Sequence, residues 1–211
     1  MYIPAAYRAD SPEIAAAIMS RHPFATLISS DASGPVATHI PLRYDASRGS
    51  QGSLFGHVAR SNSHAALFTA DRPTLAIFHG PHAYVSPTWY VDHPAVPTWN
   101  HVSVHIHGTI RVISDPAELH HQLRLLVETF ESGPGAWSMD SVPPEFLQRM
   151  AAGVVAFELS IDRIETQCKL SQKRSGADQS QVQQALRETG RPDELAVAAW
   201  MESYPLPPSM P

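Results

Sequence analysis

Cysteine and long apolar runs are scarce in this sequence of 211 residues. The single cysteine, Cys168, excludes an intrachain disulfide and suits a reducing cytoplasm. No apolar run approaches the length of a membrane span, and the first ten residues lack the charged-then-apolar layout of a secretory signal peptide. We therefore expect a cytoplasmic protein that does not cross a membrane.

Positive charge is also scarce. Lys169 and Lys173 are the only lysines, and the formal net charge is -5. A broad nucleic-acid-binding face needs a basic surplus, so this charge balance argues against one without excluding a local patch. The two lysines and Arg174 form the one dense positive cluster, which is either an anion site or a solvated loop.

Motifs of several common enzyme classes are missing as well. No Gly-x-Gly-x-x-Gly follows a predicted strand, which argues against a Rossmann layout. No Gly-x-Ser-x-Gly elbow is present, and Cys168 lies in a predicted strand, where a buried structural thiol is the default. A catalytic triad therefore has little support.

What the sequence does contain is a succession of strand patterns. Strands are predicted at residues 24–30, 36–44, 53–59, 75–80, 98–113 and 154–170. Helices are predicted at residues 10–21 with Asp10 as cap, 64–69, 115–130 with Asp115 as cap, 145–152, 179–188 and 193–203. This order predicts a mainly β fold, an antiparallel barrel with helical additions, and the tail at 205–211 has no core to join.

The chain is organised around residues 75–108, which hold six of its twelve histidines. Between its two strands lies a loop dense in Gly, Pro, Trp and Tyr, which we interpret as the wall of a ligand site. Trp89, Tyr90 and Trp99 either stack on a flat heteroaromatic ligand or anchor a core or an interface. In the second strand, side-chain alternation predicts one face of His101, Ser103, His105 and His107 and an opposite face of Val102, Val104 and Ile106.

Two groups of polar residues are candidates for binding chemistry. The first group is His101, His105 and His107, and no Asp or Glu lies among them, so hydrogen-bonded imidazoles are favoured over a metal site. The other group combines hydroxyls, imidazoles, an amide and a guanidinium near the ends of two strands, as a phosphate site requires, although the residues alone favour an ordinary hairpin with polar ends. Its members are Thr38, His39, His57, Arg60, Ser61 and Asn62.

An ordered set of motifs carries a resemblance to a known family. The motifs are Met1-Tyr-Ile-Pro4, Ala37-Thr-His-Ile-Pro41, Gly56-His-Val-Ala-Arg-Ser-Asn62, Phe78-His-Gly-Pro-His-Ala-Tyr-Val-Ser86, Pro87-Thr-Trp-Tyr90, Val96-Pro-Thr-Trp-Asn100, Val104-His-Ile-His-Gly108 and Lys169-Leu-Ser-Gln172. Together they resemble the PaiB-type FMN-binding negative transcriptional regulators. The sequence departs from that family at His101, where an aromatic residue is expected, and at Lys173, where Asn is expected.

The resemblance implies a split β-barrel, antiparallel and of Greek-key type, with flanking helices, as in pyridoxamine-phosphate oxidases and small flavin reductases. It implies a homodimer with FMN at the subunit interface, a barrel domain at residues 1–175 and a helical extension at 176–211 packed on it. The cofactor-binding residues carried over are Thr38, His39, Ile40, Pro41, Leu42, His57, Val58, Ala59, Arg60, Ser61, Asn62, Trp99, Lys169, Gln172 and Arg174.

Three functions follow from this reasoning. The first is a flavin-dependent transcriptional regulator, although the two C-terminal helices around Thr189-Gly190-Arg191 carry few basic residues for DNA contact. The second is a flavin-dependent oxidoreductase or flavin reductase, for which His79, His82 and His107 are the acid–base candidates. The third is a heme-binding or heme-degrading relative, suggested by the abundance of histidine.

Overall fold

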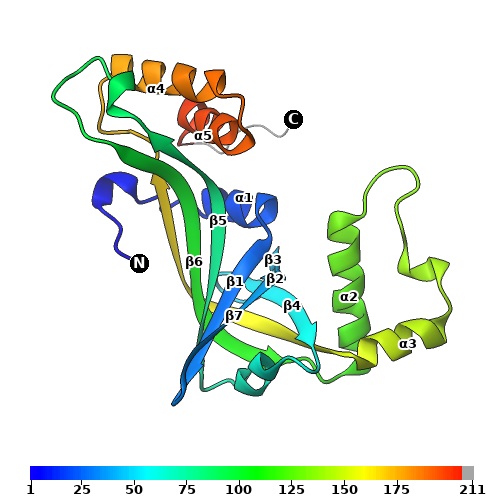
Figure 1. Ribbon diagram of the computed structural model, residues 1–211. Helices are drawn as coiled ribbons and strands as arrows, with labels where there is room; N and C mark the ends of the chain where they lie inside the picture. Colours follow the sequence, from blue (N-terminus) through cyan, green and yellow to red (C-terminus); the bar gives the residue numbers. More distant parts are fainter. Residues whose placement is uncertain (206–211) are drawn as a thin grey trace. The chain divides into compact units, whose positions relative to one another are not determined.

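The computed structural model describes residues 1–205, so the end of the predicted tail, residues 206–211, lies outside the described residues (Figure 1). The strands are β1 (Phe24–Asp31), β2 (Gly34–Pro41), β3 (Arg43–Asp45), β4 (Ser53–Ala59), β5 (Pro73–Val85), β6 (Thr98–Val112) and β7 (Val154–Lys169). The α-helices are α1 (Pro12–Arg21), α2 (Pro116–Phe130), α3 (Pro144–Ala152), α4 (Gly176–Glu188) and α5 (Pro192–Ser203). Short 3-10 helices are η1 (Ala5–Tyr7), η2 (Ser63–Leu67), η3 (Pro87–Trp89) and η4 (Met139–Ser141). None of the helices within residues 1–205 has both the length and the apolar character that a membrane crossing needs.

The strands form one seven-stranded antiparallel sheet in the order β2-β1-β5-β6-β7-β4-β3. The prediction of a mainly β, antiparallel fold with flanking helices is therefore confirmed. Along residues 1–205 no strand pairing joins β2 to β3, so the sheet is not closed into a continuous barrel. Its two edge strands are nevertheless consecutive in the chain, with only Leu42 between them, so the sheet must curl until its edges approach each other.

The prediction of a single strand at residues 36–44 is wrong, because this segment contributes to two strands, β2 and β3. β2 pairs with β1, and β3 pairs with β4 at the other edge of the sheet. Pro41 has no N–H to donate to a ladder, and the N–H of the buried Leu42 donates to the carbonyl of Pro23 at 2.9 Å. The chain therefore changes edges at this point.

Strand β5 is longer than the prediction, which ended it at Gly80. Gly80 and Pro81 are both buried, and this pair shifts the alternation so that His82 and Tyr84 continue the exposed face begun by His79. A Cβ on Gly80 would lie 2.3 Å from the Val102 side chain, so glycine permits the close approach of β6 here. The first five residues of the predicted aromatic loop, 81–85, are consequently strand.

Local capping explains most helix starts. Asp115 accepts the N–H of Glu118 at 2.9 Å and caps α2, as predicted. For α1 the cap is Ser11, which accepts the N–H of Ile14 at 3.3 Å, so the expectation of Asp10 was off by one residue. The helix expected at residues 64–69 is the shorter 3-10 helix η2, for which the Asn62 side chain accepts the N–H of His64.

The described chain divides into two compact units that share the long strands β5, β6 and β7. The first unit comprises residues 1–22, 78–105 and the chain from residue 165, and the second comprises residues 23–77 and 106–164. Each has its own buried apolar residues, such as Ile18, Val104 and Trp200 in the first and Leu27, Leu54 and Phe157 in the second. The domain boundary at residue 175 stays a prediction.

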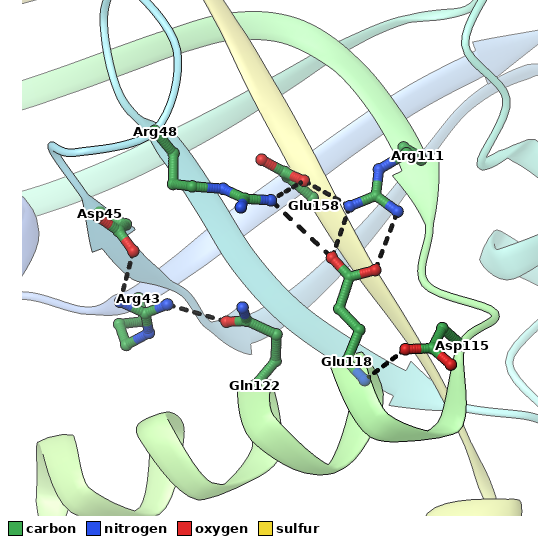
Figure 2. A network of polar contacts seen from close by, with 8 residues as sticks. All are labelled: Arg43, Asp45, Arg48, Arg111, Asp115, Glu118, Gln122 and Glu158. Atoms are coloured by element: carbon green, nitrogen blue, oxygen red, sulfur yellow. Dashed lines mark hydrogen bonds and ion pairs between the residues drawn. The ribbon is translucent and has the colours of Figure 1, made fainter.

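Helix α2 belongs to the second unit, and an ion-pair network joins its first turn to the sheet. Figure 2 shows Glu158 of β7 between two guanidiniums: Arg48 Nη2 lies 3.1 Å and Arg111 Nη2 2.7 Å from Glu158 Oε2. Arg111 also binds Glu118 of α2 in bidentate fashion, at 2.7 and 3.2 Å. Burial alone would raise the pKa of Glu158, but the hydrogen bonds from the two arginines hold it below its ordinary value.

Two further contacts fix α2 against the sheet. Arg43 of β3 donates to Gln122 at 2.9 Å (Figure 2). Leu119 packs on the buried cluster of Phe55, Ile113 and Ala156. Leu119 also lines the wall of a cavity, together with Pro116, His120 and Arg124 of the same helix.

Candidate functional site

Two of the predicted site segments meet at the hydroxyl of Thr38 on β2. The Asn62 Nδ2 group donates to Thr38 Oγ1 at 3.4 Å, and Thr38 Oγ1 lies 2.8 Å from Nδ1 of His64. The hydroxyl has two lone pairs and one proton, so it accepts from Asn62, and the tautomer of His64 decides which of Oγ1 and Nδ1 donates in the second bond. The structure therefore brings the start of η2 and the middle of β2 together, and we call Thr38, Asn62 and His64 the Thr38 node.

His64 was not among the predicted site residues, yet it is the buried end of this node. Its side chain has no exposed surface and packs against Phe68, with ring centroids 5.2 Å apart. Burial lowers the pKa of His64, which favours the neutral imidazole. Among the described residues its Nε2 atom has no hydrogen-bond partner. The sequence signal was a polar residue, Asn62, placed to cap a short helix that begins with a histidine.

Arg60 and Ser61 follow β4 and are exposed. The Arg60 guanidinium donates from Nε to the carbonyl of Ala152 and from Nη2 to that of Val154, both at 2.7 Å. These bonds fix the plane of the guanidinium at the junction of α3 and β7. Its remaining nitrogen, Nη1, can donate hydrogen bonds to an anion.

The other predicted site residues of the second unit differ in solvent exposure: some are buried, some half-buried and some exposed. Ile40, Leu42 and Val58 are buried core side chains, so a ligand could use only their backbone groups. His39 is exposed, lies 3.0 Å through Nδ1 from the Thr26 hydroxyl and stacks on Phe24. Ala59 is also exposed, whereas Pro41 and His57 are half-buried, and burial lowers the pKa of His57.

The four remaining predicted residues, Trp99, Lys169, Gln172 and Arg174, lie in the first unit. There each cation of the positive cluster rests on an aromatic ring. Lys169 Nζ lies 6.0 Å and Lys173 Nζ 5.6 Å from the centre of the Tyr7 ring, and the Arg174 guanidinium lies 3.9 Å from that of Tyr90. The segment is thus ordered by aromatic contacts.

Lys169 and Gln172 are also held by hydrogen bonds at the end of β7. Lys169 donates to the Thr98 hydroxyl, and burial lowers the pKa of Lys169. Gln172 donates to the carbonyl of Cys168 and accepts the N–H of Leu170 at 2.7 Å. Between them Ser171 adopts a left-handed φ of 64°, and the buried Asn100 donates to its hydroxyl at 2.9 Å. Asn100 is a second structural residue of this region that the sequence reasoning did not select.

Trp99 carries an exposed aromatic surface. It is 54% exposed, and its ring lies 6.0 Å from the rings of both His82 and Tyr84 on β5. Tyr84 is itself 44% exposed. We call Trp99, His82 and Tyr84 the Trp99 face; neighbouring exposed aromatics of this kind are typical of a surface that a ligand or partner covers.

Contacts from Arg174 and Asp178 hold the end of the aromatic loop. Tyr90 is buried beneath Arg174, so it is a core anchor and its ring is not available for stacking on a ligand. Asp178 on α4 is fully buried, and its Oδ1 accepts the N–H groups of Val91 at 2.7 Å and Asp92 at 3.0 Å. The loop thereby becomes a fixed part of the first unit.

The histidines of β6 follow the predicted alternation. Val102, Val104 and Ile106 are essentially inaccessible, while His101 and His107 are partly exposed. Ser103, expected on the histidine face, is buried. Burial lowers the pKa of His101, and the charge of Lys169 adds to this effect. Across residues 1–205 no three His, Cys, Asp or Glu side chains are arranged to hold a metal ion.

Comparison with known proteins agrees with the resemblance. The model of a family described as "Putative FMN-binding domain" matches residues 1–163. Protease synthase and sporulation protein PAI 2 of Bacillus subtilis is 31% identical over 205 residues, which covers 96% of this chain and 97% of that protein. The match therefore extends over nearly the full length of both chains.

Solved structures share the fold at low identity. The flavocytochrome Anf3 of Azotobacter vinelandii superposes with a TM-score of 0.58 and 19% identity, covering 80% of this chain and 69% of that one. An FAD and heme binding protein of Mycobacterium smegmatis gives a TM-score of 0.57 and 18% identity, covering 77% and 73%. These likenesses show the fold alone. The family model and the near full-length match show that this chain belongs to the PaiB-type family of FMN-binding proteins.

Proposed function

We propose that this protein is an FMN-dependent transcriptional regulator of the PaiB type, with FMN bound at residues Thr38–Leu42 and His57–Asn62. The observation that carries the proposal is the Thr38 node, because it joins the two segments that the family resemblance assigns to the cofactor. FMN presents a dianionic phosphate, ribityl hydroxyls and a flat ring with polar atoms along one edge. A binding site needs an oriented cation, hydroxyl and amide donors, and strand backbone groups.

The residues present fit that requirement. Arg60 offers Nη1 from a guanidinium whose plane is fixed by two carbonyls, and Ser61 beside it is exposed. Asn62 uses one amide hydrogen toward Thr38, which leaves the other for a ligand. We assign the phosphate to Arg60, Ser61 and Asn62, and the ribityl chain and ring edge to the β2 segment from Thr38 to Leu42.

His64 is a positioning residue in this proposal. Because Asn62 and His64 both bind the Thr38 hydroxyl, the direction of the Asn62 amide depends on the neutral imidazole behind it. When bound, FMN supplies one- and two-electron redox chemistry, and the chain supplies orientation and charge around it. A regulator built this way would respond to FMN content or flavin redox state.

The proposal includes a homodimer in the cytoplasm. An exposed Trp99 face is the kind of surface that association covers, and we propose that a second copy covers it together with FMN. Lys169, Gln172 and Arg174 would then close the site from the same or the other subunit. The one cysteine, Cys168, is buried and free, as suits a reducing compartment.

DNA contact has little support from α4 and α5. Arg187 of α4 lies 2.7 Å from Glu202 of α5, and Arg191 lies 2.5 Å from Glu194, so the charges of this helix pair are largely matched. The regulatory part of the proposal rests on family membership. A mobility-shift assay of FMN-loaded and FMN-free protein on its own promoter tests it, with shifts that survive 200 mM salt counted as specific. If the FMN-loaded protein oxidises NAD(P)H faster than free FMN does and gives no specific mobility shift, the protein is an oxidoreductase and not a regulator.

A further inference from the structure

The second unit contains a cavity that shares a single wall residue, Arg60, with the proposed FMN site. Its volume is about 760 Å³, and it lies among α2, η4 and α3. Pockets for small molecules in proteins commonly measure about 300–1,000 Å³. Of the residues assigned to FMN, Arg60 alone reaches its wall.

The wall is mostly apolar. Leu119 and Leu147 face it from the two helices, Met139 from η4 and Ala151 from the last turn of α3. None of the residues of α2 or α3 is fully buried, although both helices are amphipathic. Apolar helix faces that flank a cavity without filling it are suited to an apolar ligand.

The charges around the cavity favour an anionic end on that ligand. The Arg124 guanidinium binds the carboxylate of Asp140 in bidentate fashion, at 2.7 and 2.9 Å, so these two charges cancel. Arg60 remains in the wall without a carboxylate bound to it among the described contacts, and His120 is a further wall residue, near Asp140, that can donate a hydrogen bond from its ring. The wall thus has a positive balance against an apolar interior.

The cavity is also held in a fixed shape. The Glu158 network anchors the first turn of α2 to the sheet, and Leu119 packs on the buried cluster of the sheet while it also lines the cavity. On the opposite wall, the Arg60 guanidinium binds the carbonyl at the end of α3. A preformed wall reduces the entropy lost when a ligand binds.

We propose that this cavity is a second small-molecule site, which binds an amphipathic carboxylate with its chain among the leucines and its carboxylate near Arg60 and His120. The site goes beyond the proposed function, because its apolar wall lies outside the residues assigned to FMN, and the two sites share only Arg60. The probe is decanoate below its micellar concentration, measured by isothermal titration calorimetry on the full chain, with 1-decanol as the neutral probe of equal length.

One site per chain is expected, and decanol should bind about tenfold more weakly than decanoate. Ala151→Trp fills the cavity and should weaken decanoate at least about tenfold, whereas Met150→Trp is the matched control, because Met150 is exposed on the same helix and outside the wall. His120→Glu keeps the volume open but adds negative charge, so it should weaken decanoate and leave decanol unchanged. His120→Glu also tests the site by itself if the Ala151→Trp variant does not fold.

FMN titration of the same variants separates this site from the flavin site. Ala151→Trp should leave FMN affinity within about twofold of the wild type. The inference is overturned if decanoate does not bind, if it binds Ala151→Trp and His120→Glu as well as the wild type, or if Ala151→Trp loses FMN in parallel. A dimer that dissociates in Ala151→Trp while the wild type takes up no decanoate would also overturn it, because a second copy would then fill the cavity.

Discussion

Removing the charge of Glu158 tests how the second unit holds α2. Glu158→Gln keeps the shape of the side chain but abolishes the ion pairs with Arg48 and Arg111. Glu158 is 7% exposed, while the two arginines are about half exposed, so each charged hydrogen bond is weaker than a fully buried one. We expect a loss of about 1–2 kcal/mol in the free energy of unfolding at pH 7.

The stability difference between the wild type and Glu158→Gln should depend on pH. The pKa of Glu158 in the folded protein is lower than its ordinary value of 4.5, so its contribution to stability is present above pH 4.5 and is lost as the pH falls through the folded-state pKa. The stability gap between wild type and Glu158→Gln should therefore shrink below about pH 4.5. The gap is measured by urea unfolding followed by circular dichroism at pH 7, 5 and 4.

Glu128→Gln is the matched control, since it removes the same charge from an exposed position on α2. It should change stability by no more than about 0.5 kcal/mol. A Glu158→Gln protein as stable as the wild type at pH 7, or a gap that does not vary with pH, would refute the view that this network holds α2 on the sheet.

Three further predictions concern Thr38, Asp178 and Cys168. Thr38→Val should cost about 1–2 kcal/mol of stability, because it leaves the Asn62 amide and His64 Nδ1 without their shared partner, and Thr38→Ser should restore most of it in the same unfolding assay. Asp178→Ala should cost about 2–4 kcal/mol and speed amide exchange at Val91 and Asp92, whereas unchanged exchange would contradict the role given to Asp178. Burial raises the pKa of Cys168 to about 12, so a thiol reagent at pH 8 should label it only after unfolding; rapid labelling of the native protein would contradict its burial.

Sequence patterns predicted the elements of this fold better than their pairing. The alternation in residues 98–113 and the Asp115 cap are local features, and each was recovered in β6 and α2. The change of sheet edge at Leu42 depends on a missing N–H at Pro41 and on a long-range bond to Pro23, which no local pattern reveals. Strand β5 passes Gly80 because its neighbour Val102 requires a glycine there, and that neighbour is distant in sequence.

The candidate site shows the same limit. The polar residues around Thr38 and Asn62 were found from residue type and order, and the structure joins them at one hydroxyl. His64 was missed because its role depends on burial, which a single histidine after a polar turn does not indicate. The cavity beside α2 was missed as well, because an amphipathic helix predicts an apolar face and does not tell whether protein or ligand covers it.

The most direct test of the account is an FMN titration of the purified chain, followed by flavin absorbance and fluorescence after dialysis. We predict that each chain binds one FMN and that binding shifts the flavin spectrum. Arg60→Gln should bind FMN at least about tenfold more weakly. Arg149→Gln, which changes an exposed arginine stacked on Phe146, should bind FMN as the wild type does. A chain that takes up no FMN, or an Arg60→Gln variant that binds it as tightly as the wild type, would contradict the flavin site proposed around Thr38 and Asn62.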